Sequence, residues 1–276
     1  MKRQIDWLDI LIKCKNNIQE KIVPLIGKAE RCQQNLGVGA GGDIIKYADI
    51  VAENAIIDTF KENGISSFTL ISEESGIKEY GPKPSECFLT ADPIDGTTNF
   101  TRGIPFFATS IALSNKPELT AIHTALVADL LHGTTYTAQK GKGAHRNNQK
   151  ISPSKNMSLE EAVIGVDLNT YRVQEIAPRL NNIISRVKHI RHLGANALEL
   201  CYVADGTTDA FIDIRGKLRS TDVAAAWLII NEAGAKITTP EGQALNIKLD
   251  PKQTVAFVAA NKEIHKTILN LLKISK

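Results

Sequence analysis

The sequence predicts a mixed α and β (α+β) protein of two halves, residues 1–150 and 151–276, packed as one compact unit. Three patterns predict this class. The chain opens with apolar residues at helical spacing, a strand-rich meander follows at 106–138, and strands alternate with helices after about residue 155. No linker rich in proline, glycine or serine separates the halves, which favours intimate packing between them.

The N-terminal half is expected to begin with two helices. Apolar residues recur at 3-to-4 spacing over 5–34 and again over 46–62, and Pro24 is expected to kink or split the first helix. Between them lies the glycine-dense stretch 36–43, which lacks the Lys-Ser/Thr pair of a phosphate-binding P-loop. It is either a connector or a flexible lid over a site.

Short strands follow these helices. Two are expected at 67–72 and 86–91, and three more form the meander, at 106–113, 121–127 and 134–138. Glycines and asparagines between positions 141 and 148 predict tight turns after the meander.

In the C-terminal half, strands and helices alternate, which is typical of an α/β unit. The expected strands lie at 162–166, 188–191, 209–214, 235–238 and 254–259. The expected helices lie at 172–187, 196–205, 222–233 and 262–273.

Composition excludes several classes of protein. The 276 residues are 43% hydrophobic and 23% charged, with a net charge of +3, which is too small to indicate a nucleic-acid partner. The longest clean apolar run, 223–230, is too short to span a membrane, and the N-terminus does not read as a signal peptide. The cysteines show no zinc spacing and are expected to be thiols in a reducing cytoplasm; they are Cys14, Cys32, Cys87 and Cys201.

Two carboxylates three residues apart are the most informative feature of the chain. Asp92 and Asp95 follow the apolar run 87–91, so we expect them at the carboxyl end of a buried strand. Carboxylates a few Å apart repel by roughly 4 kcal/mol per pair at an effective dielectric near 20, so such a pair holds either a proton or a cation. Oxygen ligands suit a hard ion such as Mg²⁺. Candidate partners are Glu73, at the end of another strand, and Asp222, at the start of a helix.

Three motifs carry a family resemblance. Residues 92–100 read Asp-Pro-Ile-Asp-Gly-Thr-Thr-Asn-Phe, which resembles the signature of the inositol monophosphatase family, a group of Mg²⁺-dependent, Li⁺-sensitive phosphatases. Residues 72–75 resemble the family's Glu-Glu-Ser motif, and 221–227 resemble its Trp-Asp-x-Ala-Ala element, with Thr221 in place of the usual Trp. The motifs occur in family order, and the similarity in layout covers most of the chain.

The resemblance implies a layered α-β-α-β-α sandwich that hydrolyses a phosphate monoester with a metal-activated water and no covalent intermediate. It implies two or three Mg²⁺ ions, with Mn²⁺ as a substitute, and a homodimer. The layout looks most like the archaeal branch that acts on inositol monophosphate and fructose 1,6-bisphosphate. Small phosphate esters, rather than nucleic acid or a membrane, are therefore the expected partners.

The same resemblance assigns metal ligands. Glu73, Asp92 and the Ile94 carbonyl resemble the first metal site, and Asp92, Asp95 and Asp222 resemble the second. A third, weaker ion in the family uses the position of Glu73.

By the same resemblance, Thr97 positions the attacking water and Asp49 accepts the Thr97 proton. A helix that begins at Gly96 and Thr97 would point free N–H groups at the phosphate, and glycine permits close approach.

Substrate contacts are assigned by position in the family pattern. Gly194, Asn196 and Asp213 occupy the places of residues that contact the inositol or sugar ring. Several bases are candidates for binding a distal phosphate through charge-assisted bonds, and the alternative is that they are solvated surface residues. These bases are Arg172, Arg191, Arg215, Lys217 and Arg219.

One segment repeats part of the signature. Residues 205–208 read Asp-Gly-Thr-Thr, but no Asp-Pro precedes them and they follow helical spacing, which predicts a helix end capped by Gly206.

Two alternative functions stay open. One is a phosphatase of the same superfamily that acts on 3′-phosphoadenosine 5′-phosphate or NADP. The other is a regulatory binding protein that kept the fold without catalysis.

Overall fold

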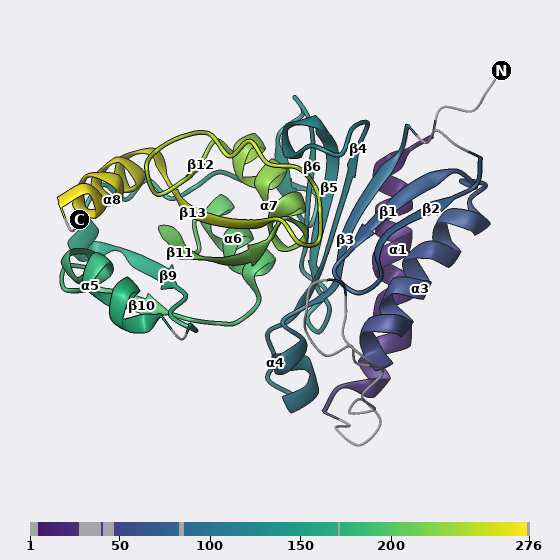
Figure 1. Cartoon of the computed structure of the whole chain (residues 1–276), viewed down its shortest axis with the longest axis horizontal. Coiled ribbons are helices and arrows are strands. Elements are labelled where there is room, and N and C mark those ends of the chain that lie inside the picture. The colour runs from purple at the N-terminus through teal and green to yellow at the C-terminus, as the bar shows by residue number, and fades with distance from the viewer. Residues whose placement is uncertain (1–4, 28–39, 41–46, 83–85, 171, 275–276) are drawn as a thin grey trace.

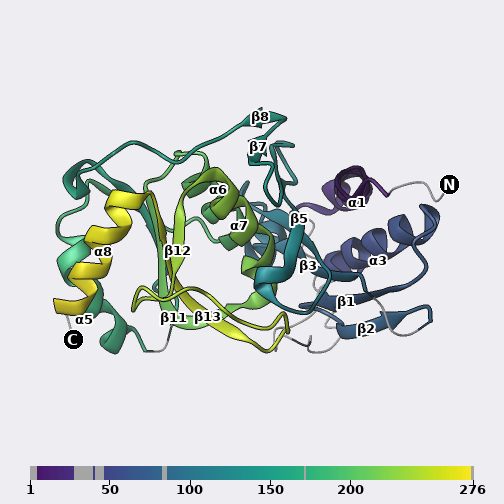
Figure 2. The same cartoon turned by 90° about the horizontal axis from the view of Figure 1, so that it is seen from above.

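The computed structural model describes residues 5–27, 40, 47–82, 86–170 and 172–274. Five layers stack in order: two helices, an eight-stranded sheet, two helices, a five-stranded sheet and two outer helices (Figures 1 and 2). The predicted α+β fold with α-β-α-β-α layering is therefore confirmed.

The first layer consists of α1 (Trp7–Ile22) and α3 (Tyr47–Glu62). Asp6 caps α1, because its side chain accepts from the backbone N–H groups of Leu8 and Asp9. The helix expected over 5–34 ends at Ile22, and Pro24 lies in the 3₁₀ turn η1 (Val23–Leu25), since proline cannot supply the N–H of a helix interior. The rest of that expected helix, 28–34, and nearly all of the glycine-dense stretch 36–43 lie outside the described residues.

The eight-stranded sheet has the order β2-β1-β3-β4-β5-β6-β7-β8. Only β1 and β3 pair in parallel; the others are antiparallel, so the predicted meander is confirmed. The strands are β1 (Phe68–Ser72), β2 (Gly76–Tyr80), β3 (Phe88–Asp95), β4 (Ala108–Ser114), β5 (Ile122–Asp129), β6 (Thr135–Gln139), β7 (Ala144–Arg146) and β8 (Gln149–Lys150). The edge strand β2 was not predicted, because its three central residues, 77–79, are all exposed and two of them are charged.

The five-stranded sheet has the order β10-β9-β11-β13-β12 and lies wholly in the C-terminal half. Its strands are β9 (Val163–Val166), β10 (His189–Arg191), β11 (Ala210–Arg219), β12 (Lys236–Thr238) and β13 (Thr254–Ala260). The outer helices are α5 (Val173–Ile184) and α8 (Lys262–Ile274), and the 3₁₀ turns η2 (Leu119–Ala121) and η3 (Leu159–Glu161) connect strands. Each strand and helix expected in this half is present, although β11 runs five residues beyond its expected end.

Two helices, α6 (Asn196–Ala204) and α7 (Ser220–Ala233), fill the space between the sheets (Figure 2). Residues 223–230, the longest apolar run, form the buried body of α7, with only Trp227 partly exposed. The largest apolar core draws side chains from both sheets and from these two helices. Helix positions in this layer are therefore fixed from both sides.

Two strands depart from regular pairing where they reach the middle of the molecule. β3 continues past residue 91 to Asp95, and its register against β4 shifts between Asp92 and Asp95, around Pro93, which has no N–H to pair. β11 shifts against β13 between Asp213 and Leu218. No helix in the described part of the chain is long and apolar enough to cross a lipid bilayer.

Candidate metal centre

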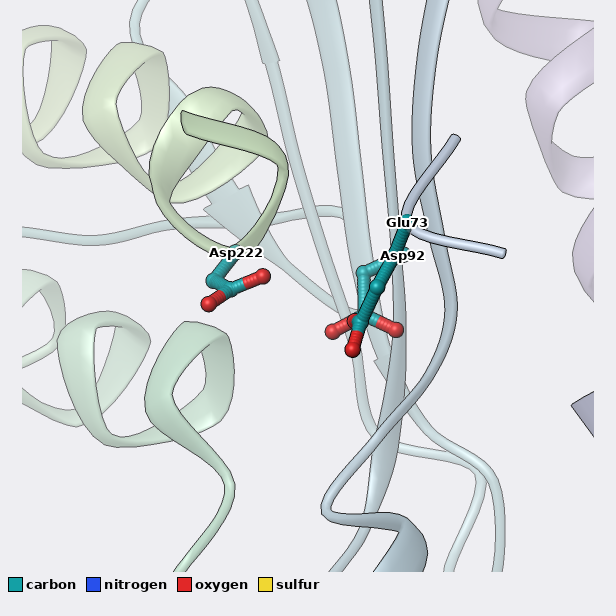
Figure 3. A group of neighbouring side chains, drawn as sticks. All are labelled: Glu73, Asp92 and Asp222. Carbon is teal, nitrogen blue, oxygen red and sulfur yellow. The ribbon is translucent and has the colours of Figure 1, made fainter. Parts of the chain in front are cut away.

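Three carboxylates from distant parts of the chain meet between the halves of the molecule. Glu73, Asp92 and Asp222 each offer an oxygen, and these oxygens lie within 4.8 Å of one another (Figure 3). Glu73 directly follows β1, Asp92 lies in β3, and Asp222 is the third residue of α7. Asp222 is fixed by its neighbours, since it accepts from the backbone N–H of Arg219 (3.0 Å) and from the hydroxyl of Thr221 (3.0 Å).

The cluster is electrostatically strained without a counter-ion. Burial raises the pKa of Asp92 well above its ordinary value, and the charges of Glu73, Asp95 and Asp222 raise it further. A divalent cation would remove this repulsion, and oxygen-only donors are the ligands that Mg²⁺ prefers. The donor set therefore fits a hard divalent cation.

Asp95 lies beside this group of carboxylates and also forms hydrogen bonds to the start of α6. Burial and the nearby charge of Asp222 raise its pKa to about 7, although two backbone bonds oppose the rise. Its carboxylate oxygens accept from the N–H groups of Asn196 (2.9 Å) and Ala197 (2.7 Å), so Asp95 ties the start of α6 to β3. A carboxylate oxygen has more than one lone pair, so these bonds leave acceptor capacity for a cation.

Thr97 and Asp49 are brought together as the resemblance implies. The Thr97 hydroxyl donates to the Ile94 carbonyl at 2.9 Å and lies 3.5 Å from an oxygen of the buried Asp49 on α3. Gly96 precedes the six-residue helix α4 (Thr97–Arg102) at a φ of 88°. A Cβ at Gly96 would lie 3.0 Å from the Gly194 carbonyl oxygen, so both conformation and space require glycine there.

The carboxylates face a cavity of about 1240 Å³ between the two halves. The N-terminal half contributes Asp49, Glu73, Asp92 and α4 to its lining, and the C-terminal half contributes Asp167, Asn169, His192 and Lys217. Polar groups therefore line the cavity well beyond the metal ligands, which leaves room for a substrate larger than phosphate.

The expected ring-contacting residues fall in different places. Gly194 and Asn196 line the cavity. Asp213 is fully buried and is not among the lining residues. Instead it forms an ion pair with Arg215, whose Nη2 lies 2.5 Å from Asp213 and 2.5 Å from Asp167. Arg215 lines the cavity, but its positive charge is already paired with two carboxylates.

The other candidate bases also differ in their surroundings. Arg172 forms an exposed ion pair with Glu175 at 2.6 Å, and Arg191 is exposed and donates to the Ile190 carbonyl at 2.9 Å. Neither is among the residues that line the cavity. Lys217 and Arg219 do line it, and Arg219 forms an ion pair with Glu73.

Sequence reasoning missed two buried residues that shape the site. Glu199 accepts from the N–H groups of Leu193 (3.1 Å) and Gly194 (3.0 Å), and burial raises its pKa. Asn99 donates to the carbonyls of Phe106 and Leu193 at 2.7 Å each, so it joins α4 to the segment before α6. The motif position of Asn99 could have drawn attention to it, whereas no local signal marks Glu199.

The repeated Asp-Gly-Thr-Thr string ends a helix, as predicted. Asp205 is the C-terminal cap residue of α6, and Gly206 adopts a φ of 80°. Asp205 accepts from the Tyr136 hydroxyl at 2.7 Å and from Arg146 at 3.1 Å, and it does not line the cavity.

Comparison with known proteins gives consistent matches. The model of the inositol monophosphatase family matches residues 7–276. The chain is 34% identical to a fructose-1,6-bisphosphatase/inositol-1-monophosphatase of Methanothermobacter thermautotrophicus, over 97% of each chain. It is 33% identical to a bifunctional NADP phosphatase/NAD kinase of Methanococcus maripaludis, covering 97% of this chain but 49% of that protein, so it spans about half the length of that relative.

Solved structures agree with this. A crystal structure of an inositol monophosphatase–fructose 1,6-bisphosphatase superposes with a TM-score of 0.85 at 31% identity, over 97% of this chain and 100% of the other. A Pyrococcus horikoshii protein described as similar to inositol-1 monophosphatase gives a TM-score of 0.80 at 33% identity, over 96% of this chain and 97% of the other.

Proposed function

Because this chain belongs to the inositol monophosphatase family, we propose that it is a divalent-metal-dependent phosphatase that hydrolyses inositol monophosphate and fructose 1,6-bisphosphate. The observation that carries the proposal is the cluster of Glu73, Asp92 and Asp222 at the wall of a large polar cavity. Several archaeal relatives bear both activities in their names, and they match this chain over nearly its whole length.

We propose Mg²⁺ as the native ion and Mn²⁺ as a substitute. Glu73, Asp92 and the Ile94 carbonyl would hold one ion, Asp92, Asp95 and Asp222 a second, and a third, weaker ion would share Glu73. Bound there, the cations would supply positive charge against the phosphate oxygens and lower the pKa of a nearby water. The repulsion among the buried carboxylates supports this assignment, since only a cation relieves it without protonation.

The chain's own residues would orient the reactants. Thr97, held 3.5 Å from Asp49, would accept a hydrogen bond from the attacking water and direct it, while Asp49 takes the hydroxyl proton. The backbone N–H groups of Gly96 and Thr97 would bind the phosphate, and Gly194 and Asn196 would contact the ring. With reactants held in this way, most of the catalytic gain comes from positioning and charge.

Three further properties are part of the proposal. We propose a homodimer, sensitivity to Li⁺ and a location in the cytoplasm. The free thiols of Cys14, Cys87 and Cys201, buried or partly buried, are consistent with a reducing compartment.

A second candidate is hydrolysis of the 2′-phosphate of NADP or of 3′-phosphoadenosine 5′-phosphate. Two relatives named NADP phosphatase/NAD kinase, at 33% and 32% identity, favour NADP as the substrate in this second candidate. A non-catalytic role is favoured by similarity to the Nus factor SuhB of Pasteurella multocida, at 31% identity over 84% of this chain. The intact set Glu73, Asp92, Asp95, Thr97 and Asp222 argues against loss of catalysis.

A substrate panel tests the proposal. Phosphate release would be measured from inositol 1-phosphate, fructose 1,6-bisphosphate, NADP and 3′-phosphoadenosine 5′-phosphate, each with MgCl₂ and with EDTA. We expect Mg²⁺-dependent release from the first two and none by the Asp92→Asn variant. Faster release from NADP would favour the second candidate, and no release from any ester would favour a non-catalytic role.

A further inference from the structure

The basic side chains that line the cavity differ in whether they already form an ion pair with a carboxylate. Among the described residues, four arginine and lysine side chains line it: Arg102, Arg215, Lys217 and Arg219. Arg215 is buried between two aspartates, with its Nη2 2.5 Å from an oxygen of each. Arg219 forms an ion pair with Glu73. Little positive charge from these two arginines is therefore left for a substrate.

The remaining two bases lie in different parts of the cavity. Lys217 lies in the irregular part of β11, where its Nζ donates to the Asn169 carbonyl at 3.3 Å. Arg102 is the last residue of α4, is exposed and lines the cavity, and its side chain forms no hydrogen bond or ion pair with the described part of the chain. Arg102 is thus a base of this cavity whose charge no carboxylate among the described residues neutralises.

The backbone that carries Arg102 is anchored by contacts to other segments. Asn99 ties α4 to two carbonyls at 2.7 Å, and Phe100 packs edge-on against Phe107 with ring centroids 5.2 Å apart. Gly103 ends the helix at a φ of 70°. A guanidinium on such a support loses less freedom on binding an anion than one on a mobile loop, which favours selective recognition.

Arg102 also lies at a useful distance from the reaction centre. It stands five residues after Thr97 on one helix, which places their Cα atoms about 7.5 Å apart along the axis. With the reach of its own side chain, Arg102 could meet a group on the order of 10 Å from a phosphate held beside Thr97. That is the span of a small sugar carrying anionic groups at opposite ends.

We propose that Arg102 is a specificity-determining residue that binds a second anionic group, such as a distal phosphate, on the substrate. The inference rests on the proposed phosphatase function and assigns the distal group to α4. The planar guanidinium would bind it with two parallel charge-assisted hydrogen bonds. Arg215, expected from sequence to play this part, instead holds Asp167 and Asp213 in place.

A pair of matched substrates tests the proposal. Fructose 1,6-bisphosphate and fructose 1-phosphate differ only in the distal phosphate, so the ratio of their kcat/KM values isolates its recognition. We expect Arg102→Gln to lower this ratio by about 10- to 100-fold, and Arg102→Lys to lower it less because the charge remains. Lys217→Gln removes a positive charge from the same cavity, and we expect it to change the ratio by less than about threefold.

Two outcomes would overturn the role of Arg102. One is an Arg102→Gln variant that loses kcat/KM equally for both substrates, and the other is a Lys217→Gln variant that lowers the ratio as much as Arg102→Gln does. Calorimetric titration of both esters into protein loaded with Ca²⁺ gives a readout without turnover. If the wild type releases no phosphate yet binds the bisphosphate more tightly through Arg102, the proposed function fails while the Arg102 site stands.

Discussion

Asp95 is expected to make the stability of the metal-free protein depend on pH. Its pKa in the folded chain is about 7, against an ordinary value of 3.8. Below the ordinary value both folded and unfolded chains carry the proton, so the group contributes nothing. As the pH rises further, the unfolded chain gives up the proton while the folded chain keeps it, so stability falls until the pH passes the folded pKa.

The size of this effect follows from the two pKa values. Linkage gives a destabilisation on the order of 2 kcal/mol at about pH 5 and on the order of 4 kcal/mol at about pH 8. Asp95 alone therefore lowers the free energy of unfolding by roughly 2 to 3 kcal/mol over this interval. Asp92, whose pKa is also raised, acts in the same direction.

The perturbation is Asp95→Asn, and the assay is urea unfolding in EDTA across this pH interval. The variant loses at least one of the two bonds to the start of α6, which shifts its stability by a constant amount. The pH-dependent part of the stability remains in the difference between the two proteins, while contributions common to both, including those of the partly buried His123 and the buried His265, cancel. A difference that stays the same from about pH 5 to about pH 8 would refute the reasoning.

Other variants test the site itself. Asp92→Asn should abolish Mn²⁺ binding seen by electron paramagnetic resonance and lower turnover by on the order of a hundredfold or more, with an unchanged circular dichroism spectrum; retained Mn²⁺ binding would contradict its assignment as a ligand. Arg219→Gln should tighten Mn²⁺ binding about fivefold without substrate, because its ion pair with Glu73 opposes the cation; unchanged affinity would show that it does not. Thr97→Val should lower kcat about a hundredfold, whereas Thr97→Ser should keep most of it, because only the hydroxyl reaches Asp49; equal losses would count against that role.

Much of the architecture was accessible from local patterns. Periodicity located the helices and most strands, because an amphipathic segment has to bury its apolar side wherever it lies. The boundaries that failed have local causes. Pro24 ended the first helix earlier than its apolar spacing suggested, and Pro93 allowed β3 to continue into acidic residues through an irregular pairing. Apolar periodicity says nothing about a strand whose last residues are charged.

The partners within the site were not accessible in this way. Asp95 bonds to backbone groups 101 and 102 residues away, and Glu73 pairs with a base 146 residues away. Arg215 looked available for a substrate because its sequence neighbours are basic, yet Asp213, two residues away, and Asp167 enclose it once β11 shifts register. Which charges remain available is set by tertiary packing, so residue type alone overstates the number of anion-binding bases.

The two Asp-Gly-Thr-Thr strings show where local sequence stops determining function. Gly96 and Gly206 adopt nearly the same left-handed conformation, with φ of 88° and 80°, so the string sets the turn. Around Asp95, however, the same strand β3 supplies a second carboxylate and α6 supplies backbone donors, whereas Asp205 ends a helix and accepts from a tyrosine and an arginine. The same four residues thus make a cation-attracting turn in one place and a helix terminus in the other. The neighbouring carboxylates that the fold brings to each string account for the difference.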